Sequence, residues 1–402
     1  MSSSRAFPLA RALARTTTTA PSLARNARCI ATTSRLHVRA VFGATSNDDL
    51  ETTLKEIQEK ITLPAHLPRE QRSILRDRKK KNYIEQNPVV IEIEGLVHKY
   101  TSLVLAKDMP NSKHIFKQAI KNMHTREDWA NLETLLSGFK KAGIALKPKH
   151  YGFASRRAIA SEQLYSLIEC ARHVQDTGYL LSANGESGFV VLLALAHRAT
   201  TENHAQTIKW LEKVQDILER SPHKELSNIN DLRSSKLARG LMLSARIADV
   251  QASESPSEAQ MNNLSDEVER ARALWTRALD AQNESLQLEI DELGLNSLRR
   301  ITRTQADGTT TYTAMSFHTM SPSRVVAIIS HNIKAFESVA SVTAQTCDPL
   351  PEAGKRLDAY LTKRITEGAQ LDSHLQAKIP VLAGVYQEIV GRAPTWAELA
   401  TQ

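Results

Sequence analysis

Cysteines, aromatic residues and long apolar runs are scarce in this sequence. Of its 402 residues, 3 are cysteine and 5% are aromatic. Cys29, Cys170 and Cys347 lie too far apart for a metal-ligand or redox motif, so a disulfide framework or zinc finger is excluded as the basis of the fold. The longest apolar run after the N-terminal segment, Phe189 to Ala196, is far shorter than the roughly 20 residues of a transmembrane helix. We therefore expect no transmembrane segment and no metal site.

Motifs that carry catalysis are also missing. The chain has no glycine-rich phosphate loop and no zinc-binding pair of histidine and glutamate, and Gly185-Glu186-Ser187-Gly188 lacks the spacing of a nucleophile elbow. The 13 histidines are scattered along the chain without metal-ligand spacing. We expect a protein that is not an enzyme, has no catalytic residues or cofactor, and binds no small molecule.

Acidic residues are absent from the first 47 positions, before Asp48. An arginine-rich segment without acids, with many Ser, Thr and Ala, is typical of a mitochondrial transit peptide. It also explains the net charge, because removing its seven arginines lowers the value from +8 to about +1. We predict that residues 1–47 are a disordered transit peptide and that the mature protein works in the mitochondrial matrix. The arginines are Arg5, Arg11, Arg15, Arg25, Arg28, Arg35 and Arg39.

The end of this leader has two interpretations. The run Arg28-Cys29-Ile30-Ala31-Thr32-Thr33 resembles the two-step processing pattern of matrix proteins, which would start the mature chain near Val38. The alternative is a leader cut anywhere between Cys29 and Thr45. In either case about 355 residues remain, dominated by good helix formers, so the chain is long enough for a large helical core.

Residues 48–109 form a polar and basic segment. We predict two polar helices within residues 48–84, the second beginning at about Pro68. The following stretch is rich in β-branched residues, which predicts a small β-hairpin at residues 89–104 that turns near Gly95.

From residue 110 the apolar spacing is that of helices, and it repeats. Gly143 and Gly178 each follow an apolar helical face and lie 35 residues apart. Self-similarity at this period predicts stacked helical hairpins, because one hairpin cannot bury its apolar face alone. We expect three hairpins in residues 110–220. The residues expected to be buried are Leu132, Leu136, Leu167, Cys170 and Val174.

The stretch from Leu132 to Leu181 resembles the pentatricopeptide-repeat family, organellar helical-hairpin proteins with a repeat near 35 residues. The resemblance implies an α-solenoid that binds RNA. The run Lys149-His150-Tyr151-Gly152-Phe153 keeps only the tyrosine of the usual first-helix motif, and no regular series of polar residues occupies the base-reading positions. A base-by-base RNA code is therefore not implied. Tetratricopeptide-like packing is the nearest alternative, and both give an all-α fold of stacked helical hairpins.

The repeat spacing is lost beyond residue 220, although Ala271 to Leu279 looks like the second helix of another hairpin. Thr302 to Thr313 is polar and contains Asp307-Gly308, whereas Ser321-Pro322 is a helix start with proline at the first position. The predicted organisation is a helical-repeat domain at 110–300, a linker or exposed loop at 301–320 and a C-terminal helical segment at 321–402.

Two basic groups are candidate RNA contacts. On a continuous helix, Arg69, Arg72, Arg76 and Lys80 fall at i, i+3, i+7 and i+11 and form one stripe that could follow phosphates. The alternatives are contact with a membrane surface, or a solvated or targeting-like helix without a partner. The second group lies where the first two repeat units meet. The candidate RNA-binding residues are Arg69, Arg72, Arg76, Arg78, Lys79, Lys80, Lys81, Tyr83, Lys140, Lys141, Lys147 and Lys149.

These observations favour a non-catalytic protein of mitochondrial gene expression that binds RNA or the mitochondrial ribosome. The link to RNA comes from the family resemblance, and the matrix location and basic groups agree with it. The alternative function is that of an assembly factor or protein-binding scaffold for a respiratory-chain complex.

Overall fold

The computed structural model describes a chain that is helical over most of its length. The described residues are 41–93, 96–100, 110–183, 186–201, 204–225, 231–280, 302–304, 310–312, 320–343, 348–371 and 373–400. The expected all-α fold with a small β-hairpin is confirmed. Residues 1–40 of the predicted leader lie outside the described part, and its last residues, 41–47, lie inside it.

The first helical stretch belongs to the hydrophobic core. It runs through α1 (Asp48–Ile57), the π-helical segment η1 (Gln58–Thr62) and α2 (Leu63–Ala65). Asn47 caps it by accepting a hydrogen bond from the Leu50 N–H. Leu50, Leu54 and Ile57 point into the core, so the helix predicted to be polar is amphipathic. The charged residues of its solvent side had hidden this spacing.

The next helix is shorter than predicted. α3 (Arg69–Arg76) ends at Asp77, whose backbone is extended and whose carboxylate accepts a hydrogen bond from the Lys79 N–H. The chain then restarts as η2 (Arg78–Lys80) and α4 (Lys81–Gln86). Because Asp77 starts a new element, the expected single helix from Pro68 is divided into pieces.

The predicted β-hairpin is present. β1 (Val89–Ile93) pairs antiparallel with β2 (Leu96–Tyr100), with Val89 opposite Tyr100 and Ile93 opposite Leu96. One side of the hairpin covers a small hydrophobic cluster separate from the main core. The buried members of that cluster are Leu63, Leu67, Leu75, Ile84 and Tyr100. The turn near Gly95 and residues 101–104 lie outside the described part.

Three helical hairpins follow, as predicted. The first comprises α5 (Ser112–Asn122), then α6 (Arg126–Ala130) and α7 (Leu132–Lys141). The second comprises α8 (Pro148–Ala160), then α9 (Leu164–Arg172) and α10 (Val174–Thr177). The third comprises α11 (Ser187–Thr201) and α12 (His204–Glu219).

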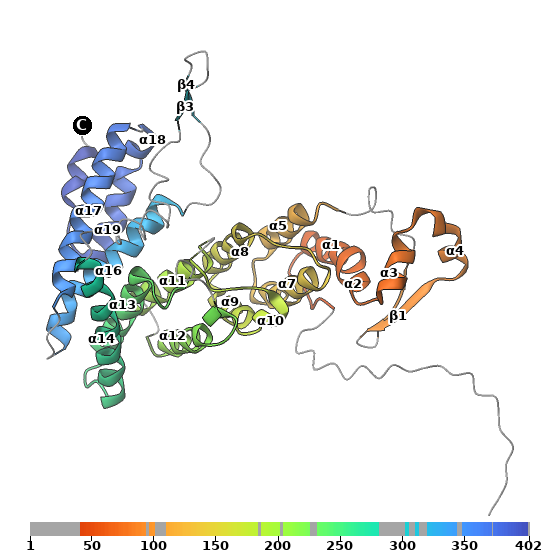
Figure 1. Cartoon of the computed structure of the whole chain (residues 1–402), viewed down its shortest axis with the longest axis horizontal. Coiled ribbons are helices and arrows are strands. Elements are labelled where there is room, and N and C mark those ends of the chain that lie inside the picture. Colours follow the sequence, from red (N-terminus) through yellow and green to blue (C-terminus); the bar gives the residue numbers. More distant parts are fainter. Residues whose placement is uncertain are drawn as a thin grey trace, which may run out of the picture. The chain divides into compact units, whose positions relative to one another are not determined.

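The hairpins pack side by side (Figure 1). The first helices contact one another in the order α5, α8, α11, and the second helices do so in the order α7, α9, α12. Gly143 and Gly178 adopt left-handed backbone conformations at φ 74° and 69°, which glycine tolerates without strain, and each follows the end of a second helix. All five residues expected to be buried are at most 6% exposed.

The C-terminal helices continue the same hydrophobic core. Their bounds are α13 (Lys236–Ala252), α14 (Glu258–Asp280), α16 (Pro322–Val342), α17 (Leu350–Leu371), α18 (Ser373–Gln376) and α19 (Ile379–Val390), with 3-10 turns η3 (His223–Glu225) and η5 (Thr395–Ala400). α13 packs against α11, α14 and α16. One cluster of buried side chains extends from Leu50 to Trp396, so residues 321–400 are not a separate body.

The segment expected to be a linker contains short strands. β3 (Thr302–Thr304) pairs antiparallel with β4 (Thr310–Tyr312). These six residues are the described part of 301–319. Threonine and tyrosine favour strands, and this preference had been outweighed by the overall polarity of the stretch.

Among the described helices, α16 is the one long and apolar enough to cross a membrane by length and composition. Two thirds of its apolar window, 67%, is buried inside the protein against other helices. Ser330, His331 and Asn332 lie in the middle of this helix and are buried with the apolar residues. This degree of burial is typical of a helix that belongs to the hydrophobic core of a protein.

Candidate nucleic-acid interface

The predicted basic stripe on residues 69–81 is interrupted. Arg69 lies on α3, whereas Lys79 and Lys80 lie beyond the break at Asp77, so Lys80 does not continue the line of Arg69 and Arg72. Arg69, Lys79, Lys80 and Lys81 are exposed, and Tyr83 is 56% exposed. The side chains of Arg76 and Arg78 lie outside the described part.

Arg72 differs from its neighbours because it is half-buried. With Arg69, Ser73 and Asp77 it lines a shallow hollow on α3. Its Nε is buried and makes no hydrogen bond to a described atom. The structure therefore places the exposed charge of this region on three short elements, α3, η2 and α4, rather than on one helix face.

Lys140 and Lys141 bond within the protein. Lys140 donates from Nζ to the carbonyl oxygen of Val174 at 3.1 Å and also to that of Gln175. These carbonyls belong to the last turn of a second helix, where a cation is favourable. Lys141 Nζ lies 2.9 Å from His66 Nδ1. Both lysines thus connect neighbouring parts of the fold.

Lys147 and Lys149 lie at the start of α8. The Lys147 N–H donates to the Nδ1 atom of His150, which is almost fully buried. Burial lowers the pKa of His150, and the positive charges of Lys117, Lys149 and Lys113 lower it further against an opposing hydrogen bond to Lys147. Lys149 therefore belongs to a group with two lysines of α5 that were missed at the sequence level.

An aromatic pair on the second helices was also missed. Tyr165 of α9 lies against Trp210 of α12, with ring centroids 6.2 Å apart. A cation covers each ring: Arg198 lies 5.3 Å from the Trp210 centroid, and Lys213 Nζ lies 4.9 Å from that of Tyr165. The contact of Lys213 with Tyr165 stabilises the junction of the second and third hairpins, and that of Arg198 with Trp210 lies within the third hairpin.

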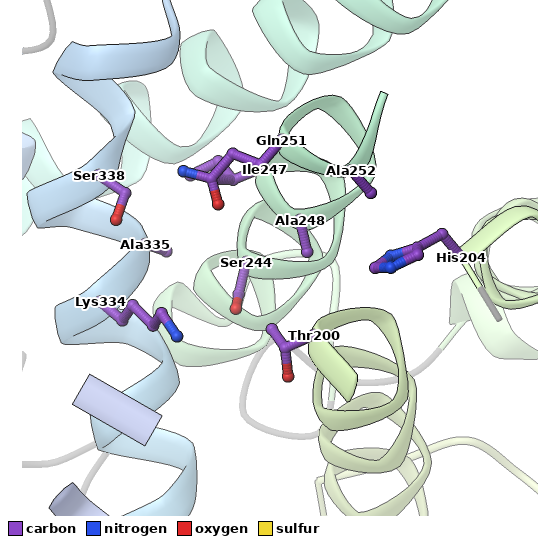
Figure 2. A pocket seen from close by; sticks show the side chains of 10 residues that line it. All are labelled: Thr200, His204, Ser244, Ile247, Ala248, Gln251, Ala252, Lys334, Ala335 and Ser338. Carbon is purple, nitrogen blue, oxygen red and sulfur yellow. The ribbon is translucent and has the colours of Figure 1, made fainter. Parts of the chain in front are cut away.

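A cleft of about 250 Å³ opens between the end of α11, α13 and α16 (Figure 2). Lys334, Ser244 and Thr200 line one part of it, and His204 lies on another side. Ser244 Oγ is 3.2 Å from Nδ1 of the buried His331. Burial lowers the pKa of His331 to about 3, with smaller contributions from His197 and Lys334, so its ring is neutral at pH 7.

The cleft shows no catalytic or metal geometry. Its lining contains no acidic residue that could orient His331 as the base of a catalytic triad. Within the described ranges, no three His, Cys, Asp or Glu side chains are grouped to hold a metal ion. Cys170 is buried, and burial raises the pKa of its thiol well above the usual value, so it remains protonated. The exposed cations are thus the better candidates for function.

Comparison with known proteins identifies a family of mitochondrial ribosomal proteins and a relative that is a small-subunit ribosomal protein. The small ribosomal subunit protein mS27 of Neurospora crassa is 27% identical over 262 residues, which are 60% of this chain and 66% of that protein. The match thus spans just under two thirds of the relative's length. The family model described as mitochondrial ribosomal protein mS27 matches residues 28–384, and since this is most of the sequence, the chain belongs to that family.

Proposed function

We propose that this protein is a non-catalytic constituent of the small subunit of the mitochondrial ribosome, where it binds ribosomal RNA and neighbouring proteins. The observation that carries the proposal is the family match over residues 28–384. The stacked hairpins support it, because a series of packed helices offers a long surface for macromolecules rather than an enclosed site. The mitochondrial ribosome works in the matrix, in agreement with the expected location.

We infer further that the three hairpins are of the pentatricopeptide type. Support comes from the 35-residue separation of Gly143 and Gly178 and from the two parallel series of first and second helices. The first helices lack a regular series of base-reading residues, so recognition would depend on the shape and backbone of RNA.

The family assignment favours this function over a scaffold for a respiratory-chain complex. Two observations support RNA as a direct partner: the exposed cations of residues 69–81, and the lysines around His150. Contact with a membrane is the weaker alternative, because the long apolar helix α16 is committed to the core.

Sedimentation of the tagged protein from mitochondrial lysates tests the proposal. We expect it to move with the small ribosomal subunit, and to move to lighter fractions after ribonuclease treatment. Migration with respiratory complexes, unchanged by ribonuclease, would support the scaffold function instead. A second tag on a known small-subunit protein provides the reference position.

A further inference from the structure

Acidic residues are missing from the first helix of all three hairpins. α5, α8 and α11 contain 11, 13 and 15 residues, or 39 in total, and none is Asp or Glu. At the chain's average of 44 acids in 402 residues, about four would be present. The second helices contain eight acids: Glu127, Asp128, Glu133, Glu169, Asp176, Glu212, Asp216 and Glu219. The two series of helices thus differ in charge.

The lysines of α5 form a regular exposed row. Lys113, Lys117 and Lys121 are spaced at i, i+4 and i+8, so successive side chains lie about 6 Å apart along the helix axis. Ile115, Phe116, Ala119 and Ile120 occupy the opposite side and are buried in the core. Core packing therefore fixes the direction in which the lysines point.

Lys149 adds a fourth charge from the neighbouring helix. α5 packs against α8, and Lys149 lowers the pKa of the same buried His150 as Lys113 and Lys117 do, through its positive charge. We call these four residues, Lys113, Lys117, Lys121 and Lys149, the α5–α8 lysine surface. In the described structure none of them forms an ion pair.

The arginines of the first helices already make contacts within the protein. Arg156 pairs with Glu186 at 2.8 Å, and Arg157 donates to the carbonyl oxygen of Lys121. Arg198 covers the ring of Trp210. Among the first helices, the positive charge available to a partner is therefore concentrated on the α5–α8 lysine surface.

We propose that the α5–α8 lysine surface binds the phosphate backbone of ribosomal RNA. The proposal rests on the proposed function and assigns a location to its RNA contact. A row of cations without carboxylates fits a polyanion, because each lysine can neutralise a phosphate and release a counterion.

The composition of this surface favours RNA over an acidic protein. Protein interfaces usually have a central group of aromatic or other large apolar side chains. Neither α5 nor α8 has a large hydrophobic side chain among the exposed ones of the described chain, which are Tyr83, Val90, Val97, Tyr165 and Val381. Binding through charge alone is characteristic of phosphate contacts, which position a protein without reading sequence.

The test compares two quadruple variants purified from mitochondria. The first changes Lys113, Lys117, Lys121 and Lys149 to Gln. The matched control changes Lys209, Lys224, Lys355 and Lys378 to Gln; these are exposed, outside the ion pairs of the described structure, and remove the same charge. Affinity for small-subunit ribosomal RNA transcribed in vitro is measured over a series of salt concentrations.

We expect the α5–α8 variant to reduce the steepness of log affinity against log salt by about three units. Four phosphate contacts are removed, and each contributes roughly 0.7–0.9 unit of slope. The control should leave it nearly unchanged. The partial variant K113Q/K117Q should lose about half as much, which guards against a folding defect in the quadruple variant. Replacement of all four by Arg should retain the slope.

Equal slopes for the α5–α8 variant and the control would overturn this inference but leave the proposed function intact. Loss of ribosome association without a change in RNA slope would identify an acidic protein partner and would also overturn it. Failure of the unmodified protein to sediment with the small subunit would instead contradict the proposed function.

Discussion

Ser46 is joined to Asp128 by two hydrogen bonds across 82 positions of the chain. Its N–H donates to Oδ1 at 2.8 Å and its Oγ to Oδ2 at 2.7 Å. The N–H groups of His124 and Thr125 donate to the same carboxylate. Residues 41–47 thus pack on the first hairpin instead of being disordered, and the position of the leader's end remains a prediction.

The Asp128 carboxylate should make stability depend on pH. Burial raises its pKa, but the hydrogen bonds from Ser46, Thr125 and His124 outweigh this and lower the pKa from 3.8 to about 2. A lowered folded-state pKa stabilises the protein above the unfolded value, and this contribution is lost as the pH falls from about 4 to 2. It amounts to about 2 kcal/mol.

Asp128→Asn should therefore lower the free energy of unfolding by about 2 kcal/mol at pH 7, measured by urea denaturation. The difference from the unmodified protein should shrink as the pH approaches 2. The exposed Asp266 provides a control, since Asp266→Asn should change stability by less than about 0.5 kcal/mol. A pH-independent difference would show that charge is not the cause.

Gly240 is needed where α13 approaches α16. A Cβ there would lie 1.7 Å from Oδ1 of Asn332, whose Nδ2 donates to the carbonyl oxygens of Leu237 and Ile328. Gly240→Ala should therefore destabilise the protein by about 1–3 kcal/mol despite its gain in helix propensity. Gly384→Ala should have the opposite sign, a gain of about 0.5–1 kcal/mol, because nothing lies within 4 Å of its added Cβ. Thermal unfolding of both variants checks the pair.

Leu167 tests the core of the second hairpin. Its side chain is fully buried. Leu167→Ala should lower the free energy of unfolding by about 2–5 kcal/mol, through lost burial and the cavity left behind. Val381, which is 61% exposed, provides the control, and Val381→Ala should have little effect in the same urea titration. Similar values for both would contradict the packing of this hairpin.

The sequence predicted the hairpins because their signals are local. Leu132 and Leu167 repeat at helical spacing before glycines that end the second helices, and those glycines do have left-handed backbones. The hydrogen bonds between Ser46 and Asp128 could not be predicted in this way, because they join segments far apart in sequence and depend on how the chain folds back.

The candidate site was predicted only in part, for two physical reasons. Asp77 can either continue a helix or cap the next one. Only the structure shows that it caps η2, by accepting a hydrogen bond from the Lys79 N–H, and so interrupts the basic stripe. Lys113, Lys117 and Lys121 were visible at i, i+4 and i+8. Their importance depends on the packing of α5 beside α8, which brings Lys149 to the same surface.

The last prediction concerns Lys79, Lys80 and Lys81, the three exposed lysines of the first basic group. If they bind phosphates, changing all three to Gln should lower the salt dependence of RNA binding by about two units of slope, with the fold unchanged by circular dichroism. If they are only solvated, nothing is lost, because no contact is broken. Lys81 has a weak competing partner, since Glu85 lies 3.9 Å away on the next turn, so Lys79→Gln/Lys80→Gln should retain most of the effect. An unchanged slope in both variants would leave the α5–α8 lysine surface as the remaining candidate for RNA contact.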